Sequence, residues 1–197
     1  MIVYHIDRDQ TLKAGQEIKL KTSNLSECYI EQKMFPQGFS QHGLHYINEG
    51  FQHNPGNQAE FYVLEYELEL IRRCFFPERP SRYQSLFACM NFEQLKNWLH
   101  IATPESIVWE LEVNNNAVTE LDASLLIPAL DYKSDDSETK TLHFSPENSF
   151  FTGFLYWSGK QRPDNPCTEL LISLNQYPVR VKKMIGTIQT LKEKGII

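Results

Sequence analysis

The spacing of hydrophobic and polar residues along the chain indicates strands mixed with helices. Alternating or short apolar runs, which are typical of strands, occur in five well-separated segments: residues 2–7, 85–90, 107–113, 169–174 and 179–185. A further short strand is expected at 17–20, because Gly15 marks a turn directly before it. The strands are dispersed over the chain, so a sheet must join residues that are far apart in sequence.

Two segments have helical spacing. Asn57, with Glu60 three residues later, forms a capping-box start, and apolar residues then recur at helical spacing as far as Phe75. Asn91 with Gln94 predicts the start of a second helix, which runs to about residue 101. The outer face of the first helix carries several glutamates and is interpreted as a solvated surface: Glu60, Glu65, Glu67 and Glu69.

Other segments are predicted to be irregular or buried. Residues 36–56 are rich in Gly, Gln, His and Asn, which predicts a long loop, and long loops often carry function. Residues 114–124 are interpreted as a turn and residues 134–140 as a polar acidic loop. The crowded aromatic residues between 150 and 157 are interpreted as core.

The order of these elements predicts an α+β fold. Helices are inserted between dispersed strands, which differs from the regular strand–helix alternation of a doubly wound parallel sheet. The chain of 197 residues is 41% hydrophobic and long enough for one substantial core, so a single domain over residues 1–197 is expected. Because no glycine-rich dinucleotide or phosphate-loop motif follows a strand, any nucleotide must be held in another way.

Charge and hydropathy limit the kinds of function that the chain can have. The formal net charge of −6 argues against a protein that coats nucleic acid. One tight basic cluster is interpreted as a solvated strand face: Arg180, Lys182 and Lys183. No segment approaches the roughly 20 apolar residues that span a bilayer, and the N-terminus lacks a signal pattern. A cytoplasmic location without membrane association is therefore expected.

The cysteines and histidines predict neither disulfides nor a metal site. The four cysteines are widely spaced and are expected to be reduced and mostly buried: Cys28, Cys74, Cys89 and Cys167. Three histidines gather in the segment that is predicted to be a loop, but they lack the His-Glu-x-x-His spacing of zinc enzymes: His42, His45 and His53. No metal is expected.

Three segments far apart in sequence carry polar side chains in or beside predicted strands. They are Val3-Tyr4-His5-Ile6-Asp7-Arg8, Ser81-Arg82-Tyr83-Gln84-Ser85-Leu86-Phe87-Ala88 and Cys167-Thr168-Glu169-Leu170-Leu171-Ile172. A buried polar group without a partner costs roughly 1 to 3 kcal/mol, so each of these groups needs a partner. A ligand is one such partner. The three segments are therefore expected to assemble one site.

These segments resemble the three motifs of the ADP-ribosyltransferase fold, in which a His or Arg, a Tyr or Ser, and a Glu converge on NAD. The opening Tyr4-His5-Ile6-x-Arg8, followed by Gly15, also resembles that of uncharacterised bacterial proteins related to these transferases. The resemblance implies two packed, mostly antiparallel sheets around an NAD cleft, with inserted helices. It also implies that NAD is a substrate and that no metal is required.

The resemblance implies roles for the first two motifs. His5 would contact the NAD ribose, and Arg8 would bind a phosphate, because its planar fork suits phosphate oxygens. In the second motif, Arg82 would bind the pyrophosphate, Tyr83 would stack on the nicotinamide, and Ser85 would bond its carboxamide. Two alternatives stay open. His5 can be a core histidine bonded to backbone, and Arg82 can form a surface ion pair beside an ordinary turn at Pro80 and Ser81.

The third motif implies the catalytic acid. Glu169 opens a short apolar strand late in the chain, where the family keeps its catalytic Glu, so Glu169 and His5 are the expected catalytic residues. A carboxylate near the ribose can orient the 2′-hydroxyl and stabilise the positive charge that develops as nicotinamide leaves. Cys167 stands where the arginine-modifying branch has its first Glu. That departure puts arginine as the acceptor in doubt.

The resemblance therefore implies an NAD-dependent ADP-ribosyltransferase. Its acceptor would be a protein side chain, a nucleic-acid base or water. By analogy, such a chain would be a bacterial toxin or phage-defence component that an antitoxin-like partner neutralises. Two alternatives remain: a module that binds NAD or ADP-ribose without turnover, and a structural or partner-binding domain in which His5 and Glu169 are separately satisfied.

Overall fold

The computed structural model describes residues 1–22, 33–49, 59–134, 140–144 and 146–197. The strands are β1 Ile2–Asp7, β2 Glu17–Ile18, β3 Ser85–Ala88, β4 Ile107–Glu112, β5 Val118–Asp122, β6 Leu130–Ser134, β7 Lys140–Phe144, β8 Thr168–Ser173 and β9 Val179–Thr187. They form two antiparallel sheets, with strand orders β1-β4-β9-β2 and β3-β8-β5, and the hairpin β6-β7. The expected α+β class is confirmed.

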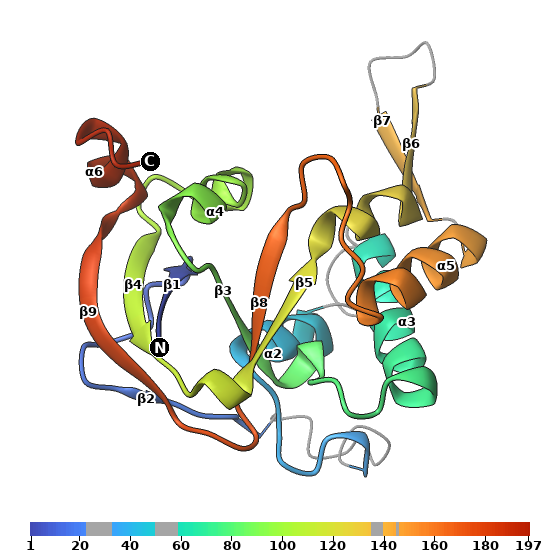
Figure 1. Cartoon of the computed structure of the whole chain (residues 1–197), viewed down its shortest axis with the longest axis horizontal. Coiled ribbons are helices and arrows are strands. Elements are labelled where there is room, and N and C mark those ends of the chain that lie inside the picture. Colours follow the sequence, from blue (N-terminus) through green and yellow to red (C-terminus); the bar gives the residue numbers. More distant parts are fainter. Residues whose placement is uncertain (23–32, 50–58, 135–139, 145) are drawn as a thin grey trace.

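The two sheets meet at β1 and β3. Tyr4 and Cys89 exchange two backbone hydrogen bonds of 2.8 Å, so the end of β3 lies alongside β1. The larger sheet curls into a half-barrel, most visibly along β4 and β9 (Figure 1). Two register shifts in β4, at Val108/Trp109 and Glu110/Leu111, accompany this curvature.

The helices cover the outer face of the smaller sheet and the ends of the half-barrel. They are α2 Gln41–Glu49, α3 Ala59–Phe75, α4 Phe92–Lys96, α5 Pro146–Trp157 and α6 Ile188–Glu193, with 3-10 turns η1 Arg82–Gln84, η2 Leu99–Ile101, η3 Asn115–Ala117 and η4 Ala123–Ala129. In Figure 1, α3 and α5 lie side by side, on the side of β8 and β5 away from the half-barrel.

Strand β8 divides the core into two layers. Leu170 and Ile172 pack into the apolar cluster between the two sheets, together with residues of β1, β3, β4 and β9. Leu171 points the other way and packs against α3 and α5, beside Leu68 and Tyr156. Alternate side chains of a strand face opposite sides of its sheet. Glu169 therefore faces the helical layer, on the same side as Leu171.

All six predicted strands are present within one to three residues at their ends. Asn91 caps α4 as expected, since its side-chain oxygen accepts the backbone N–H of Gln94 at 3.0 Å, although α4 ends at Lys96 and η2 follows it. The helix predicted to run as far as Phe75 is α3. Its capping-box residue Asn57 lies outside the described residues.

Three predictions about local structure are wrong. Residues 118–122, expected to be part of a turn, form β5, because they pair with β8 some fifty residues away. Within the predicted loop, residues 41–49 form α2, which docks on η1 through the close approach of Gly43 to the Tyr83 carbonyl. Glu65 and Glu69 are buried rather than solvated. Glu65 binds Arg82, which lies outside the helix, whereas Glu69 binds Arg72 and Arg73 at the next turn of the same helix.

The surface residues follow the predictions in part. Arg180, Lys182 and Lys183 are exposed, as expected for a solvated strand face. Of the described cysteines, Cys89 is buried but Cys74 is exposed, so the expectation of mostly buried thiols holds only in part. Within the described ranges, no helix combines the length and hydrophobicity needed to cross a membrane.

Candidate functional site

A cluster of charged and polar side chains is buried between the smaller sheet and the helices. We define the Arg82 cluster as Arg82, Glu65, Glu169, Tyr156 and His42. The guanidinium of Arg82 donates two hydrogen bonds to the Glu65 carboxylate, of 2.8 and 2.7 Å. Its Nη1 donates to Glu169 Oε1 at 2.6 Å and to the Tyr156 hydroxyl at 2.5 Å. One cation thus binds two carboxylates.

Each member comes from a different element. Glu65 lies on α3, Tyr156 on α5, Glu169 on β8, Arg82 on η1 and His42 on α2. The hydroxyl of Tyr156 donates to Glu169 Oε1 at 2.5 Å, which closes a triangle of contacts with Arg82. The cluster therefore connects five elements that are widely separated in sequence.

Two further buried carboxylates hold the segments that carry the cluster. Glu69, one turn after Glu65 on α3, accepts hydrogen bonds from Arg72, from Arg73 and from the hydroxyl of Ser81. This contact fixes the start of η1, directly before Arg82. Asp122 accepts the backbone N–H groups of Arg162 and Cys167 at 2.8 and 2.9 Å and so fixes the chain that leads into β8.

The electrostatics keep the cluster charged. Burial alone would raise the pKa of Glu65, but the Arg82 guanidinium and His42 outweigh burial and lower that pKa from 4.5 to about 2. Although burial works against its charge, the two carboxylates raise the pKa of Arg82 well above its ordinary value. Burial raises the pKa of the Tyr156 phenol, which therefore stays protonated and able to donate.

His42 lies at the edge of the cluster and connects it with the surface. Its Nε2 is 3.6 Å from Glu65 Oε1, too long for a hydrogen bond, and finds no hydrogen-bond partner among the residues that the structure describes. The ring packs against Phe87, with centroids 4.3 Å apart, and against the edge of Tyr46. Its side chain is 21% exposed. Burial lowers the pKa of His42, so the imidazole is neutral at physiological pH.

The structure brings Arg82 and Glu169 of the predicted site into direct contact. Ser85 follows on β3, where its hydroxyl donates to the Ser81 carbonyl at 2.7 Å. Tyr83 is buried in an aromatic cluster with Phe35 and Phe39. These side chains of the second motif therefore have partners within the protein, and the Arg82 guanidinium has two carboxylates.

His5 and Arg8 lie outside the Arg82 cluster. The Nδ1 of His5 is 2.7 Å from the Phe87 carbonyl, on the neighbouring strand β3. On β1, His5 shares its side of the sheet with Val3, which packs between the sheets, whereas Glu169 faces the helices. His5 and Glu169 thus point to opposite faces. Arg8 is exposed, just beyond β1.

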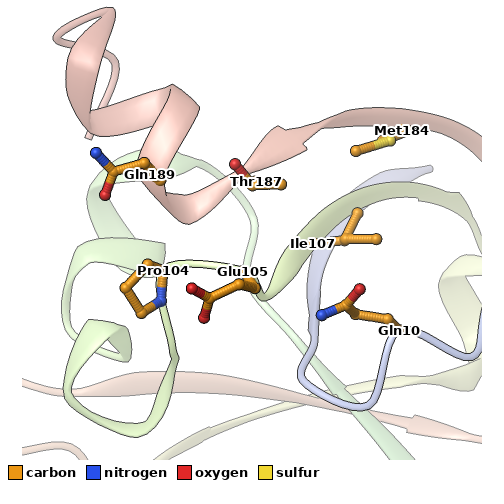
Figure 2. Close-up of a pocket in the computed structure, with 7 residues that line it drawn as sticks. All are labelled: Gln10, Pro104, Glu105, Ile107, Met184, Thr187 and Gln189. Carbon is orange, nitrogen blue, oxygen red and sulfur yellow. The ribbon is translucent and has the colours of Figure 1, made fainter.

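A surface hollow of about 510 Å³ lies elsewhere, at the end of the half-barrel (Figure 2). It is bordered by β4, β9, the start of α6 and the loops beside them, and the residues that line it are Gln10, Pro104, Glu105, Ile107, Met184, Thr187 and Gln189. Glu105 is the one charged side chain among them. None of the residues predicted for the site takes part, so the candidate site remains the Arg82 cluster.

Sequence reasoning missed three members of the cluster. Glu65 was assigned to a solvated face, His42 to a loop, and Tyr156 to ordinary core. The sequence held one signal. The same helix carries several glutamates together with Arg72 and Arg73, and so many charged residues do not all fit on its narrow exposed side. The pairing of Glu65 with Arg82, 17 residues away, depends on tertiary structure.

Fold and site together define a class: an α+β protein whose curled sheet joins a smaller sheet that carries a buried Arg–carboxylate centre. The chain belongs to a family of proteins of unknown function, DUF2441, which matches residues 3–185. The match includes all members of the Arg82 cluster as well as His5 and Arg8. No curated protein matches the chain.

Proposed function

We propose that this protein is an NAD-dependent ADP-ribosyltransferase, which transfers ADP-ribose to a macromolecular acceptor, either protein or nucleic acid. One observation carries the proposal: the three motif strands are neighbours in space. Strand β1 lies beside β3 and β3 pairs with β8, although they are far apart in sequence. At about 4.8 Å per strand, the backbones of the first and third motifs are roughly 10 Å apart, within the length of a nucleotide.

Glu169 is the proposed catalytic carboxylate. As the bond between nicotinamide and ribose breaks, its electron pair leaves with nicotinamide and the ribose carbon becomes positively charged. A carboxylate beside that carbon stabilises the charge. The acceptor nucleophile then bonds to the same carbon and releases its proton. Arg82 and Tyr156 hold the Glu169 carboxylate in place by hydrogen bonds of 2.6 and 2.5 Å.

His5 is proposed to bind a ribose hydroxyl. A carbonyl oxygen can only accept, so the contact of Nδ1 with the Phe87 carbonyl requires Nδ1 to carry the hydrogen. Burial lowers the pKa of His5, so the ring is neutral and its Nε2 keeps a lone pair. We propose that Arg8 binds a phosphate and that Arg82 binds the pyrophosphate of NAD. Tyr83 and Ser85 would bind its nicotinamide.

Access to Glu169 requires a conformational change in this proposal. Glu169 is 2% exposed, and α2 covers the cluster with His42. Shifting α2 away from η1 would open the cluster to NAD from the side on which His42 reaches solvent. Hydrogen exchange of the α2 amides should therefore change when NAD is added, and unchanged exchange at saturating NAD would exclude this route.

The test of the proposed function is an assay with labelled NAD and a total cell lysate as the source of acceptors. Wild-type protein should transfer label to macromolecules, and Glu169→Gln, which keeps the shape of the side chain, should not. Loss of the label after nuclease or protease treatment would give the acceptor class. No transfer and no nicotinamide release by the wild type would contradict the proposal.

A biological role follows from the same proposal. An enzyme that modifies macromolecules of its host acts as a toxin or phage-defence component, and an antitoxin-like protein would neutralise it. Expression of the wild type should then slow growth of a host, whereas Glu169→Gln at an equal level should not. Equal toxicity of both proteins would remove Glu169 as the catalytic residue.

A second candidate is a module of the same fold that binds NAD or ADP-ribose without turnover. The burial of Glu169 and the bond between His5 and the backbone favour it, because both groups are satisfied within the protein. This module would bind NAD measurably, in a titration calorimeter for example, and release no nicotinamide.

A further inference from the structure

The exposed side of α3 is apolar, where a surface helix normally carries charge. From Phe61 to Phe75, its exposed positions are Phe61, Val63, Tyr66, Leu70, Cys74 and Phe75. The charged residues Glu65, Glu69 and Arg72 of the same stretch are buried. The inner side of α3 is apolar as well, since Leu64, Leu68 and Ile71 pack in the core. A helix that is apolar on both sides is normally buried, which indicates that something covers the outer side of α3.

Helix α5 continues the apolar surface. Phe150, Phe151 and Phe154 are 46%, 64% and 39% exposed. The Phe75 ring joins the two helices, because its centroid lies 6.0 Å from that of Phe150 and 5.6 Å from that of Phe154. We define the α3–α5 patch as the exposed apolar residues on the outer side and the C-terminal end of α3 and on α5: Val63, Tyr66, Leu70, Phe75, Phe150, Phe151 and Phe154.

The patch is large enough for a stable interface. Its five aromatic side chains are 39% to 64% exposed. Since an aromatic side chain offers roughly 150–250 Å² of surface, these five expose on the order of 500 Å². That area lies in the upper part of the range of the largest patch on a typical monomer, roughly 300–600 Å². With Val63 and Leu70 it approaches the roughly 800 Å² that each partner buries in a standard interface.

We propose that a second copy of this chain covers the α3–α5 patch in a symmetric dimer. The charged residue beside the patch, Glu67, is half-buried and accepts a hydrogen bond from Ser149 of α5. Homodimer interfaces are the more apolar class, whereas partners that bind and dissociate usually meet through more polar surfaces. A two-fold axis places the same patch on both sides, so an apolar patch of this size covers itself. The proposal does not depend on the proposed function.

A membrane surface fits the patch less well. A helix that lies on a membrane carries Lys and Arg along its polar face. The polar residues of α3 instead face the interior, where Arg72 and Arg73 are bound to Glu69. The net charge of −6 also opposes binding to anionic lipids.

The oligomeric state of the full chain tests this proposal. Light scattering coupled to size exclusion should give twice the chain mass of 23.0 kDa. Tyr66→Glu and Phe151→Glu, each placing a charge in the patch, should raise the dimer dissociation constant at least about tenfold. The matched control is Met184→Glu, on β9, whose side chain is 48% exposed and outside the patch. It should leave the dimer intact.

Two results would overturn the proposal. One is a wild-type protein of single-chain mass up to the highest soluble concentration, including a monomer that floats with anionic vesicles. The other is a dimer whose dissociation constant is the same in both patch variants as in the Met184→Glu control. That result would place the interface elsewhere. Circular dichroism of each variant verifies that it is folded.

Discussion

Arg82 supplies the positive charge that balances two buried carboxylates at the centre of the molecule. Its guanidinium is buried and binds Glu65 and Glu169 at distances of 2.6 to 2.8 Å. Taking charges out of water costs several kcal/mol per ion, and only a partner with good geometry offsets that cost. Glu65 and Glu169 would both lose their cation if Arg82 were absent. The stability of the protein should therefore depend strongly on this one side chain.

Replacing Arg82 with Ala should lower the free energy of unfolding by about 3–5 kcal/mol, because two buried carboxylates lose their cation. Urea unfolding followed by circular dichroism measures the change. The control is Arg180→Ala, on the exposed side of β9, which should change stability by no more than about 0.5 kcal/mol. Similar losses in both variants would mean that the cluster contributes little.

The lowered pKa of Glu65 makes the stability of the folded protein depend on pH. Its pKa is about 2 in the folded protein and ordinarily 4.5. Between these values the unfolded chain binds the proton and the folded chain does not, so stability from Glu65 is complete above about pH 5 and is lost as the pH falls toward about 2. The total is on the order of 3 kcal/mol.

The variant Glu65→Gln should accordingly show a shallower loss of stability between about pH 5 and pH 2 than the wild type. Chemical unfolding at a series of pH values measures this slope. Glu78→Gln, an exposed change just after α3, is the control and should follow the wild type. Parallel curves for all three proteins would contradict the lowered pKa of Glu65.

At the scale of single residues, sequence reasoning identified the charged residues that lie in or next to predicted strands. Arg82 and Glu169 were selected through the family resemblance, as the residues that bind pyrophosphate and act in catalysis, and in the structure each is the other's partner. Glu65 and His42 were missed. A carboxylate on a helix normally faces water, and only the tertiary structure shows that Arg82 replaces water here.

At the scale of elements, α2 closes the helical layer over the cluster. It docks without a side chain at Gly43, where a Cβ atom would lie 2.2 Å from the Tyr83 carbonyl oxygen. Ser40 strengthens the contact, since its backbone N–H and its hydroxyl both donate to that carbonyl. The position of His42 above Glu65 therefore depends on a glycine next to it.

Gly43→Ala should destabilise the protein by about 1–3 kcal/mol, because the added methyl group meets backbone that cannot yield. Gly153→Ala is the matched control in α5. There the new methyl group meets the terminal atoms of Ile71 and Leu68, which can rotate away, and Ala favours the helix. Thermal unfolding compares the two. A loss for Gly153→Ala as large as that for Gly43→Ala would contradict the docking contact.

Strands were predicted better than helices, for a physical reason. Apolar alternation marks β1, β4 and β9, and a continuous apolar run marks β8, because both of its faces are buried. Strand β5 was missed because Val118–Asp122 is short and polar and becomes a strand only by pairing with β8. For α3, the apolar residues Leu64, Leu68 and Ile71 are buried as the helical spacing predicts, but Glu65 and Glu69 are buried beside them.

At the scale of the whole molecule, the sheets bring the three motifs together. The neighbouring strands β1, β3 and β8 carry His5, Ser85 and Glu169. That these strands form one site with His5 and Glu169 stays a prediction, since the two side chains point to opposite faces. The α+β class followed from the order of elements. Sequence reasoning did not show that the space between the sheets is filled by apolar core or that Glu169 faces the helices instead.

The most direct test of the central claim is the release of nicotinamide from NAD by the purified protein. Wild type should release it, Glu169→Gln should not, and Glu78→Gln should keep the activity. Glu78→Gln is the control because it makes the same change of side chain at an exposed position outside the Arg82 cluster. Equal activity of the wild type and Glu169→Gln, or no release by the wild type although it binds NAD, would contradict the assignment of Glu169 as the catalytic carboxylate.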